Sequence, residues 1–315
     1  MEMRKLFLFT IITLCAAYVR AQDVVEPPTA LLMVHFGTTY DDTRAKTIEA
    51  INAKAQQEFP GMAFAEAYTS RIVTARLEKR GIHKDNPTDA LLRLRAEGHR
   101  RIVIQPTYII DGIEMDRLRK ETDNLRPFFD SLWISTPLLY SVEDAQQVCD
   151  ILAARHPADS KKHEHVLFVG HGTESPATAL YSQLDYMMRA QGHPNYHVAT
   201  IEGYPTFDTA VREMKQMKAR KVILVPLLFV AGDHASNDIS VEWKQQLEEL
   251  GFSVELHIEG LGEVPEIQDQ YIHKMKNGSR EWHSHLYQNP ALQRLRGKPQ
   301  SHRRADSHAS ALFRQ

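Results

Sequence analysis

Short apolar runs alternate along the chain with longer stretches in which apolar residues recur every three or four positions. Apolar runs rich in β-branched and aromatic residues predict strands at 31–36, 62–68 and 101–110. Helical periodicity predicts helices at 41–59, 87–97 and 115–125. In the first helix, the predicted apolar face consists of Ala45, Ile48, Ile51 and Ala55. This alternation predicts an α/β fold with a largely parallel sheet.

The second half of the chain repeats the pattern of the first half. Residues 36–38 align with residues 171–173 at an offset of 135 positions, and Ala67 aligns with Glu202 at the same offset. Later matches, at a smaller offset, are Pro106 with Pro226, Gly112 with Gly232, and Glu114 with His234. The sequence therefore predicts two similar βα domains, an internal duplication, with a cleft between them.

The expected boundaries follow from this repeat. They are a signal peptide at 1–21, an N-terminal α/β domain at 28–135, a C-terminal α/β domain with the metal site at 136–277, and a disordered basic tail at 278–315. A last helix at 264–276 is expected to end at Asn277 and Gly278. From residue 280 the tail has seven Lys and Arg against two Asp and Glu, and it lacks periodicity. Charge alone does not predict that it binds nucleic acid.

The N-terminus has the shape of a secretory signal peptide. Basic residues precede an apolar run at 6–19, and small residues lead to a cleavage point after Ala21. The run is shorter than the ~20 residues that a spanning helix needs, so no membrane span is expected after cleavage. A lipoprotein would use Cys15, but the preceding Leu14 is bulkier than the small residue usual there. The predicted location is therefore the periplasm.

Composition limits the chemistry that the protein can use. The chain has 315 residues with a net charge of -2, which gives no reason to expect a nucleic-acid partner. It has only two cysteines, so a disulfide scaffold and a cysteine-rich zinc site are excluded. Any metal site must therefore use His, Asp or Glu. The oligomeric state is open, with a homo-oligomer among the options.

Three candidate metal ligands stand at the ends of apolar runs in the second half. His171 lies between two glycines after one run, Glu202 ends the next, and His234 follows a third run and a glycine. In open α/β sheets, ligands bind at the carboxyl ends of the strands. Two imidazoles and a carboxylate suit a divalent transition metal such as cobalt, iron or nickel. The three residues therefore predict one shared metal site.

Each candidate also has a plainer interpretation. His171 could cap a helix or bond a neighbouring carbonyl. Glu202, in an apolar stretch, could form a buried ion pair with Arg or Lys. His234 could simply lie beside a helix N-cap formed by Asp233 or Ser236.

Motifs for two other functions of α/β proteins are absent from the sequence. It contains no Gly-x-x-x-x-Gly-Lys loop and no Gly-x-Gly-x-x-Gly after a strand, which argues against a nucleotide site. It also lacks the Gly-x-Ser-x-Gly elbow of α/β hydrolases.

Seven short segments together resemble one known family. They are residues 36–39 (FGTT), 68–70 (YTS), 170–172 (GHG), 185–188 (DYMM), 202–205 (EGYP), 231–238 (AGDHASND) and 260–263 (GLGE). In this order they resemble the CbiK-type anaerobic cobaltochelatases, class II chelatases that insert cobalt(II) into sirohydrochlorin during cobalamin biosynthesis. The resemblance spans residues 31–276, nearly the whole exported portion.

The resemblance implies roles for particular residues. His171, Glu202 and His234 would be the metal-binding and catalytic residues, and a tetrapyrrole would lie in the cleft between the two copies. The residues implied in substrate binding are Phe36, Gly37, Thr38, Tyr108, Gly112, Glu114 and Gly172. Arg71 is a further hypothesis, as a partner of the carboxylates on the ring.

The chain departs from the family pattern in its first half. Thr107-Tyr108 stands where the family usually has Leu-His, and His35 replaces a small residue. Tyr108 could be an axial ligand to a haem iron, but a packed strand aromatic is favoured.

Two functions remain open from the sequence. The first is an exported chelatase acting on sirohydrochlorin or a related tetrapyrrole. The second is an exported protein that binds haem or another tetrapyrrole for iron or haem acquisition. The three candidate ligands favour the first function, and the signal peptide and the altered segment 107–114 favour the second. A sugar- or peptide-binding protein would leave the three ligands unexplained.

Overall fold

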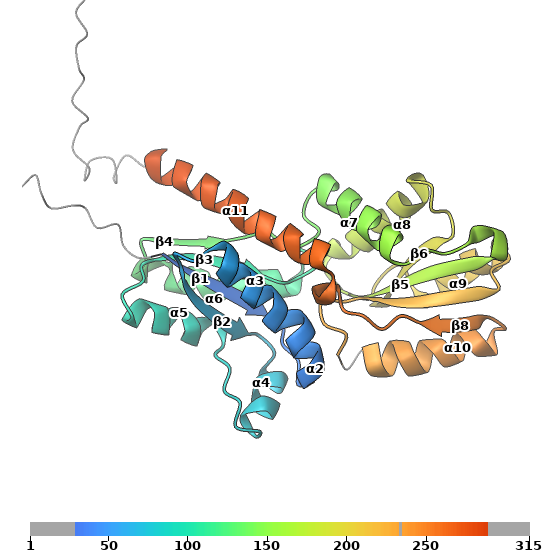
Figure 1. Cartoon of the computed structure of the whole chain (residues 1–315), viewed down its shortest axis with the longest axis horizontal. Helices are drawn as coiled ribbons and strands as arrows, with labels where there is room; N and C mark the ends of the chain where they lie inside the picture. Colours follow the sequence, from blue (N-terminus) through green and yellow to red (C-terminus); the bar gives the residue numbers. More distant parts are fainter. Residues whose placement is uncertain (1–28, 233–234, 289–315) are drawn as a thin grey trace, which may run out of the picture.

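The computed structural model of the protein describes residues 29–232 and 235–288. Its strands are β1 (Thr29–His35), β2 (Ala63–Tyr68), β3 (Arg101–Pro106), β4 (Ser131–Ile134), β5 (Glu164–Gly172), β6 (Tyr196–Glu202), β7 (Lys221–Leu227) and β8 (Ser253–Leu256). They form two four-stranded parallel sheets, ordered β2-β1-β3-β4 and β6-β5-β7-β8 (Figure 1). The α/β class is confirmed, and the matching strand order confirms the duplication.

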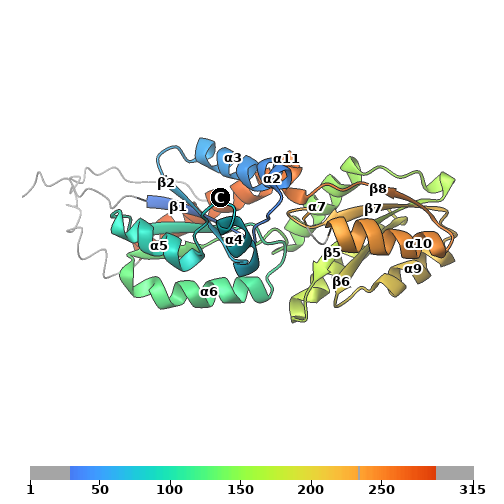
Figure 2. The same ribbon diagram turned by 90° about the horizontal axis from the view of Figure 1, so that it is seen from below.

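Helices cover both faces of each sheet. They are α2 (Asp41–Arg44), α3 (Ala50–Glu58), α4 (Arg71–Glu78), α5 (Pro87–Ala96), α6 (Ile113–Leu125), α7 (Val142–Arg155), α8 (Ala179–Ala190), α9 (Phe207–Gln216), α10 (Lys244–Glu249) and α11 (Pro265–Gln288). Around the first sheet, α3 and α11 lie on one face and α5 and α6 on the other (Figure 2). One core cluster joins the two halves through Met33, Phe168 and Tyr271.

The predicted helix at 41–59 contains a π-helical segment, η1 (Ala45–Glu49), between α2 and α3. A π turn inserts one residue and shifts the helix face that follows. Ile48, Ile51 and Ala55 are buried as predicted, but Ala45 is exposed and Arg44 is buried instead. The placement of Ala45 on the apolar face is therefore wrong, because the prediction assumed a regular period of 3.6 residues.

Helix α4 is not predicted by the apolar pattern. Leu77 is its only buried residue, so the periodic signal is weak. The helix starts instead on a local signal, because the Oγ of Ser70 accepts a hydrogen bond from the backbone N–H of Val73 at 3.3 Å.

Strand register corrects one equivalence between the halves. Val34 pairs with Ala67 in the first sheet, and Val169 pairs with Ala199 in the second. Because Val34 and Val169 are equivalent, Ala199 is the counterpart of Ala67, and Glu202 lies three residues beyond it. The predicted match of Ala67 with Glu202 is therefore wrong. The connection between the first two strands is three residues longer in the first half, so a constant sequence offset fails there.

β3 and β7 each carry a proline at the same register. Pro106 pairs with Val34 and Pro226 with Val169, which confirms their predicted equivalence. The strand expected at 101–110 stops at Pro106. Beyond it the backbone bonds to a different segment, as Leu138 N–H donates to the Tyr108 carbonyl at 2.9 Å.

Helix α11 crosses back over the first sheet (Figure 1). The Tyr271 hydroxyl donates to the backbone carbonyls of Thr107 and Tyr108, at 3.2 and 3.0 Å. The predicted end of this helix at Asn277 and Gly278 is wrong, because α11 continues through Gln288. Asn and Gly lower helix propensity by about 1 kcal/mol or less each, which a long helix tolerates. Residues 278–288 of the predicted disordered tail are therefore helical.

Several predicted features lie outside the described residues, namely the signal peptide at 1–21, His234, and the tail beyond residue 288. Among the helices that the structure describes, none has the length and apolar character needed to cross a bilayer.

His35 makes the fold sensitive to acid. It is fully buried, with Nδ1 2.9 Å from Thr107 Oγ1 and Nε2 3.0 Å from Asn52 Oδ1. Burial lowers its pKa to about 4, against the opposing effect of Glu66. In the unfolded chain, His35 has its ordinary pKa of 6.5. Between about pH 6.5 and 4, His35 is therefore protonated in the unfolded chain but neutral in the folded protein, and unfolding binds a proton. The contribution of neutral His35 to stability is therefore full above this window and is lost as the pH falls through it.

We expect the stability advantage of the wild type over His35→Gln to shrink by about 2 kcal/mol between pH 7 and pH 5. Urea unfolding of both proteins at the two pH values measures this difference. Other buried histidines, such as His156, titrate in both proteins and cancel. A difference independent of pH would show that folding does not lower the pKa of His35.

Candidate active site

A cavity of about 690 Å³ lies between the two halves, at the carboxyl ends of the strands. This volume is in the range of small-molecule and cofactor sites. Nine of the predicted site residues line it: Phe36, Gly37, Thr38, Tyr108, Gly112, Glu114, His171, Gly172 and Glu202. The tenth, His234, lies outside the described residues, although Gly232 shortly before it lines the cavity.

The first half supplies exposed apolar side chains to the cavity, next to polar and charged ones. Three large hydrophobic side chains of the lining are exposed: Phe36 by 52%, Ile72 by 67% and Ile113 by 40%. Apolar side chains that face one cavity, rather than being scattered over the surface, mark a binding site for an apolar ligand. Phe36 occupies the position that His171 holds in the second half.

The second half supplies two candidate ligands from neighbouring strands, beside the apolar lining residues 228–230. His171 lies near the end of β5, and Glu202 ends β6. Gly172 pairs with Glu202 in the parallel ladder, so the imidazole and the carboxylate leave adjacent strands at the same edge. The strand pairing therefore brings together two residues that are distant in sequence.

Gly172 is required for this close approach. Its φ is +83°, and an added Cβ would lie 1.6 Å from the carbonyl oxygen of Glu202. Gly37, its counterpart in the first half, has a φ of +100°, and an added Cβ would lie 2.5 Å from the Tyr68 ring. Only glycine adopts such a conformation without strain while leaving room for the neighbouring atoms. The glycines predicted as site residues thus shape the cavity through their backbone.

His171 bonds a neighbouring carbonyl through one ring nitrogen. Its Nδ1 lies 3.2 Å from the Gly172 oxygen, which can only accept, so Nδ1 carries the proton. In the neutral ring, Nε2 then holds the lone pair that a metal needs. The plainer interpretation of His171 is therefore present in the structure, and it is compatible with a ligand at Nε2.

Glu202 is exposed rather than buried. Within residues 29–232 and 235–288, no Arg or Lys forms an ion pair with it, so the alternative of a buried ion pair finds no support there. Ser70, its counterpart by strand register, also lines the cavity. The carboxylate at this position is therefore specific to the second half.

Tyr108 is a packed aromatic residue at the cavity wall. It is only 8% exposed, belongs to the core of the first half, and places its hydroxyl 3.5 Å from Thr69 Oγ1. Burial raises the pKa of Tyr108 well above its ordinary value, so the phenol stays protonated. A protonated phenol is a poor metal ligand, and the packing role favoured from the sequence fits this environment better than the axial role.

The sequence analysis did not identify several other residues that line the cavity. Arg76 and Arg117 line the cavity, whereas Arg71 is not among the lining residues. Arg117 donates to the Glu114 carboxylate at 2.8 Å. Tyr181 also lines the cavity, and burial raises its pKa to about 12. Arg76 lies on α4, and recognition of the Ser70 cap would have revealed that helix and the positions along it.

Comparison with known proteins gives consistent matches. The Cobalt chelatase (CbiK) family matches residues 29–280. The sirohydrochlorin cobaltochelatase of Salmonella typhimurium is 36% identical, over 77% of this chain and 93% of its own length. The sirohydrochlorin cobaltochelatase CbiKC of Nitratidesulfovibrio vulgaris is 31% identical, over 65% of this chain and 74% of its own length.

Two solved structures share the fold at low sequence identity. SirB from Bacillus subtilis with Fe³⁺ superposes with a TM-score of 0.59 and 11% identity, covering 80% of this chain and 95% of that one. CbiX, the terminal enzyme of sirohaem biosynthesis in denitrifying bacteria, superposes with a TM-score of 0.52 and 17% identity. The match covers 79% of this chain and 98% of that one. At these identities the likeness concerns the fold alone.

Proposed function

The chain belongs to the CbiK family of cobalt chelatases, and on this premise we propose that it inserts cobalt(II) into sirohydrochlorin or a closely related tetrapyrrole. The observation that carries the proposal is the set of side chains that line the cavity between the halves. Exposed apolar side chains such as Phe36 suit the face of a flat ring, and His171 and Glu202 line the same cavity from the other half.

The chemistry needs a weak metal ligand and a proton acceptor. Insertion forms bonds from the ring nitrogens to the metal while two pyrrole N–H bonds break, and both protons must leave. The Nε2 of His171 can hold a borderline divalent ion without retaining it, because a neutral imidazole adds no charge. Glu202 can balance the charge of the ion and accept a proton. We assign His234 as a further metal ligand from its sequence position alone.

Cobalt is the metal named for the relatives, and iron or nickel are alternatives that the same ligands accept. Anaerobic mixing of the protein with sirohydrochlorin and each metal, followed by absorbance, tests the proposal. We expect the metallated spectrum to form fastest with cobalt(II).

The same experiment also tests the second candidate function, tetrapyrrole binding without metal insertion. If no metal is inserted, but haem or the free ring binds tightly, the protein is a tetrapyrrole-binding protein on a chelatase fold. The apolar N-terminal run of the sequence favours this candidate, since it indicates action outside the cytoplasm.

We also propose that the protein is exported to the periplasm. The support is the sequence of residues 1–21, with its basic start, apolar run and small residues before the cleavage point. N-terminal sequencing of the protein purified from the periplasmic fraction is expected to begin at Gln22. An N-terminus at Met1 in the cytoplasmic fraction would contradict export.

The guanidinium of Arg76 is proposed to bind a carboxylate at the periphery of the ring. Replacing Arg76 with Ala should raise KM for the tetrapyrrole roughly tenfold with little change in kcat, as expected for the loss of one charge-assisted hydrogen bond. Arg71→Ala is the matched control, because Arg71 is on the same helix but does not line the cavity. Equal KM values for the two variants would remove Arg76 from substrate binding.

A further inference from the structure

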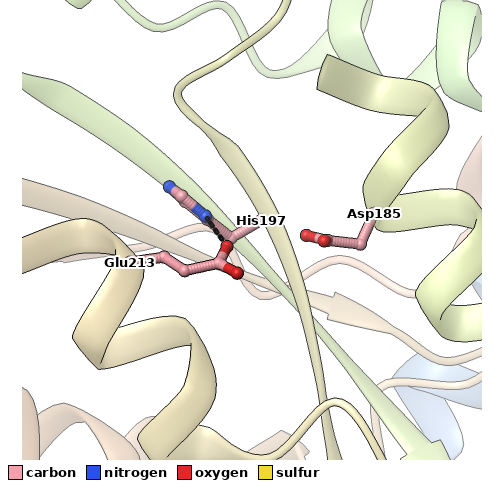
Figure 3. A group of neighbouring side chains, drawn as sticks. All are labelled: Asp185, His197 and Glu213. Atoms are coloured by element: carbon pink, nitrogen blue, oxygen red, sulfur yellow. Dashed lines mark ion pairs between the residues drawn. The ribbon is translucent and has the colours of Figure 1, made fainter. Parts of the chain in front are cut away.

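Three side chains with metal-binding atoms meet at the edge of the second sheet (Figure 3). Asp185 comes from α8, His197 from β6 and Glu213 from α9, and one ligand atom of each lies within 4.8 Å of the others. β6 is an edge strand. His197 precedes Glu202 by five residues on this strand, which places the cluster about 16 Å from the cavity residue.

His197 presents an unpartnered nitrogen to this cluster. The side chain is fully buried, and within the described residues its Nδ1 has no hydrogen-bond partner. Glu213 Oε2 lies 3.6 Å from Nδ1, which is too long for a hydrogen bond. Buried polar atoms are nearly always bonded, so an orphan nitrogen that faces a carboxylate calls for an explanation.

The other ring nitrogen of His197 contacts a second buried histidine. Nε2 lies 2.9 Å from His165 Nδ1, and the two buried rings stack 5.2 Å apart. When His197 Nε2–H donates to His165, Nδ1 holds a lone pair directed at the carboxylate of Glu213. A cation between them would convert this repulsion into coordination.

Arg189 supplies a cation in the structure. Its guanidinium contacts Asp185 Oδ2 at 2.5 Å and Glu213 Oε2 at 2.7 Å, but within the described residues it does not hydrogen-bond the Nδ1 of His197. Its side chain is 33% exposed, so it can turn into solvent. The other oxygen of Asp185 accepts the backbone N–H of Val198 at 2.9 Å, which holds that carboxylate against the edge strand. Arg189 therefore neutralises the carboxylates without satisfying the imidazole.

We propose that Asp185, His197 and Glu213 form a second site for a borderline divalent transition ion, such as cobalt(II) or zinc(II), which displaces Arg189. Imidazole nitrogen and carboxylate oxygen are both ligands that such ions accept, and three protein ligands leave a fourth position for water. Ligands of one ion lie about 3–4 Å from each other, so small side-chain movements complete the site. His165 orients the ligating ring from behind. The site is separate from the cavity and does not depend on the proposed chelatase activity.

The site is tested by measuring cobalt(II) binding to a parent variant of the full chain. This parent carries His171→Ala, Glu202→Ala and His234→Ala, so it lacks the proposed metal ligands of the cavity. Calorimetric titration is expected to show tight binding of one ion, together with the visible absorbance of coordinated cobalt. Glu213→Gln in this parent is expected to weaken binding about 10- to 100-fold. Arg189→Ala is expected to tighten it about tenfold, because the competing cation is gone.

His193→Gln is the matched control, since His193 lies near the cluster in sequence but supplies none of its ligand atoms. Glu213 is partly exposed, so its replacement should leave the fold intact, which circular dichroism in EDTA checks. The proposal is overturned if the parent binds no cobalt tightly, if Glu213→Gln binds like the control, or if Arg189→Ala fails to bind more tightly.

Discussion

Alanine at position 171 is expected to lower kcat for cobalt insertion about 10²- to 10⁴-fold, the range for loss of a group that acts directly on the reacting atoms. The reason is geometric. The carbonyl of Gly172 fixes the proton of His171 on Nδ1, so Nε2 is the nitrogen that can meet the metal beside Glu202. The side chain is only partly buried, so its removal should change stability little. Anaerobic single-turnover absorbance measures the rate directly.

Binding of the free ring separates a metal role from a structural role. Ring affinity, measured by fluorescence quenching, is expected to persist in His171→Ala, because the exposed apolar side chains of the cavity, such as Phe36, belong to the other half. His193→Ala, outside the cavity, is the control for the loss of a histidine. An insertion rate for His171→Ala equal to that of the control would exclude His171 as a metal ligand. Loss of ring binding together with insertion would show a role in substrate binding instead.

The site could be predicted to the extent that it depends on strand ends. His171 and Glu202 each follow an apolar run, and parallel strands carry their carboxyl ends to one edge, so their meeting could be inferred without coordinates. The glycines were similarly informative, because Gly172 and Gly37 mark places where the backbone must turn with a positive φ. The roles of these residues remain predictions.

Other features of the fold and of the site depend on strand register, helix period and contacts between elements, which the linear sequence pattern does not contain. The match of Ala67 with Glu202 failed because connection lengths differ between the halves, and only hydrogen-bond register shows that Ala199 is the counterpart. The exposure of Ala45 follows from a π turn, which changes the period within a helix. The cluster around His197 joins two helices and a strand, so no single periodicity could reveal it.

Replacing Gly172 with alanine is expected to give the largest loss of stability of the changes considered for the cavity, together with loss of insertion. Two penalties act at once. A φ of +83° costs a residue with a Cβ about 1–2 kcal/mol, and the added carbon would stand 1.6 Å from the Glu202 carbonyl oxygen, which is backbone and cannot rotate away. The strands must therefore separate at the point where the imidazole and the carboxylate leave them. We expect a total of at least about 3 kcal/mol in urea unfolding.

Gly192→Ala separates the two penalties of that substitution. Gly192 has a φ of +93°, and no atom lies within 4 Å of its added Cβ, so this variant should lose only the ~1–2 kcal/mol of backbone strain. The excess loss in Gly172→Ala then measures the clash between the two strands. At temperatures where both variants are folded, insertion activity should be normal in Gly192→Ala and strongly reduced in Gly172→Ala. The reason is that only the substitution at Gly172 moves Glu202. Equal losses of stability in the two variants would mean that β5 and β6 do not approach closely at Glu202, and the proposed geometry of the metal site would have to be abandoned.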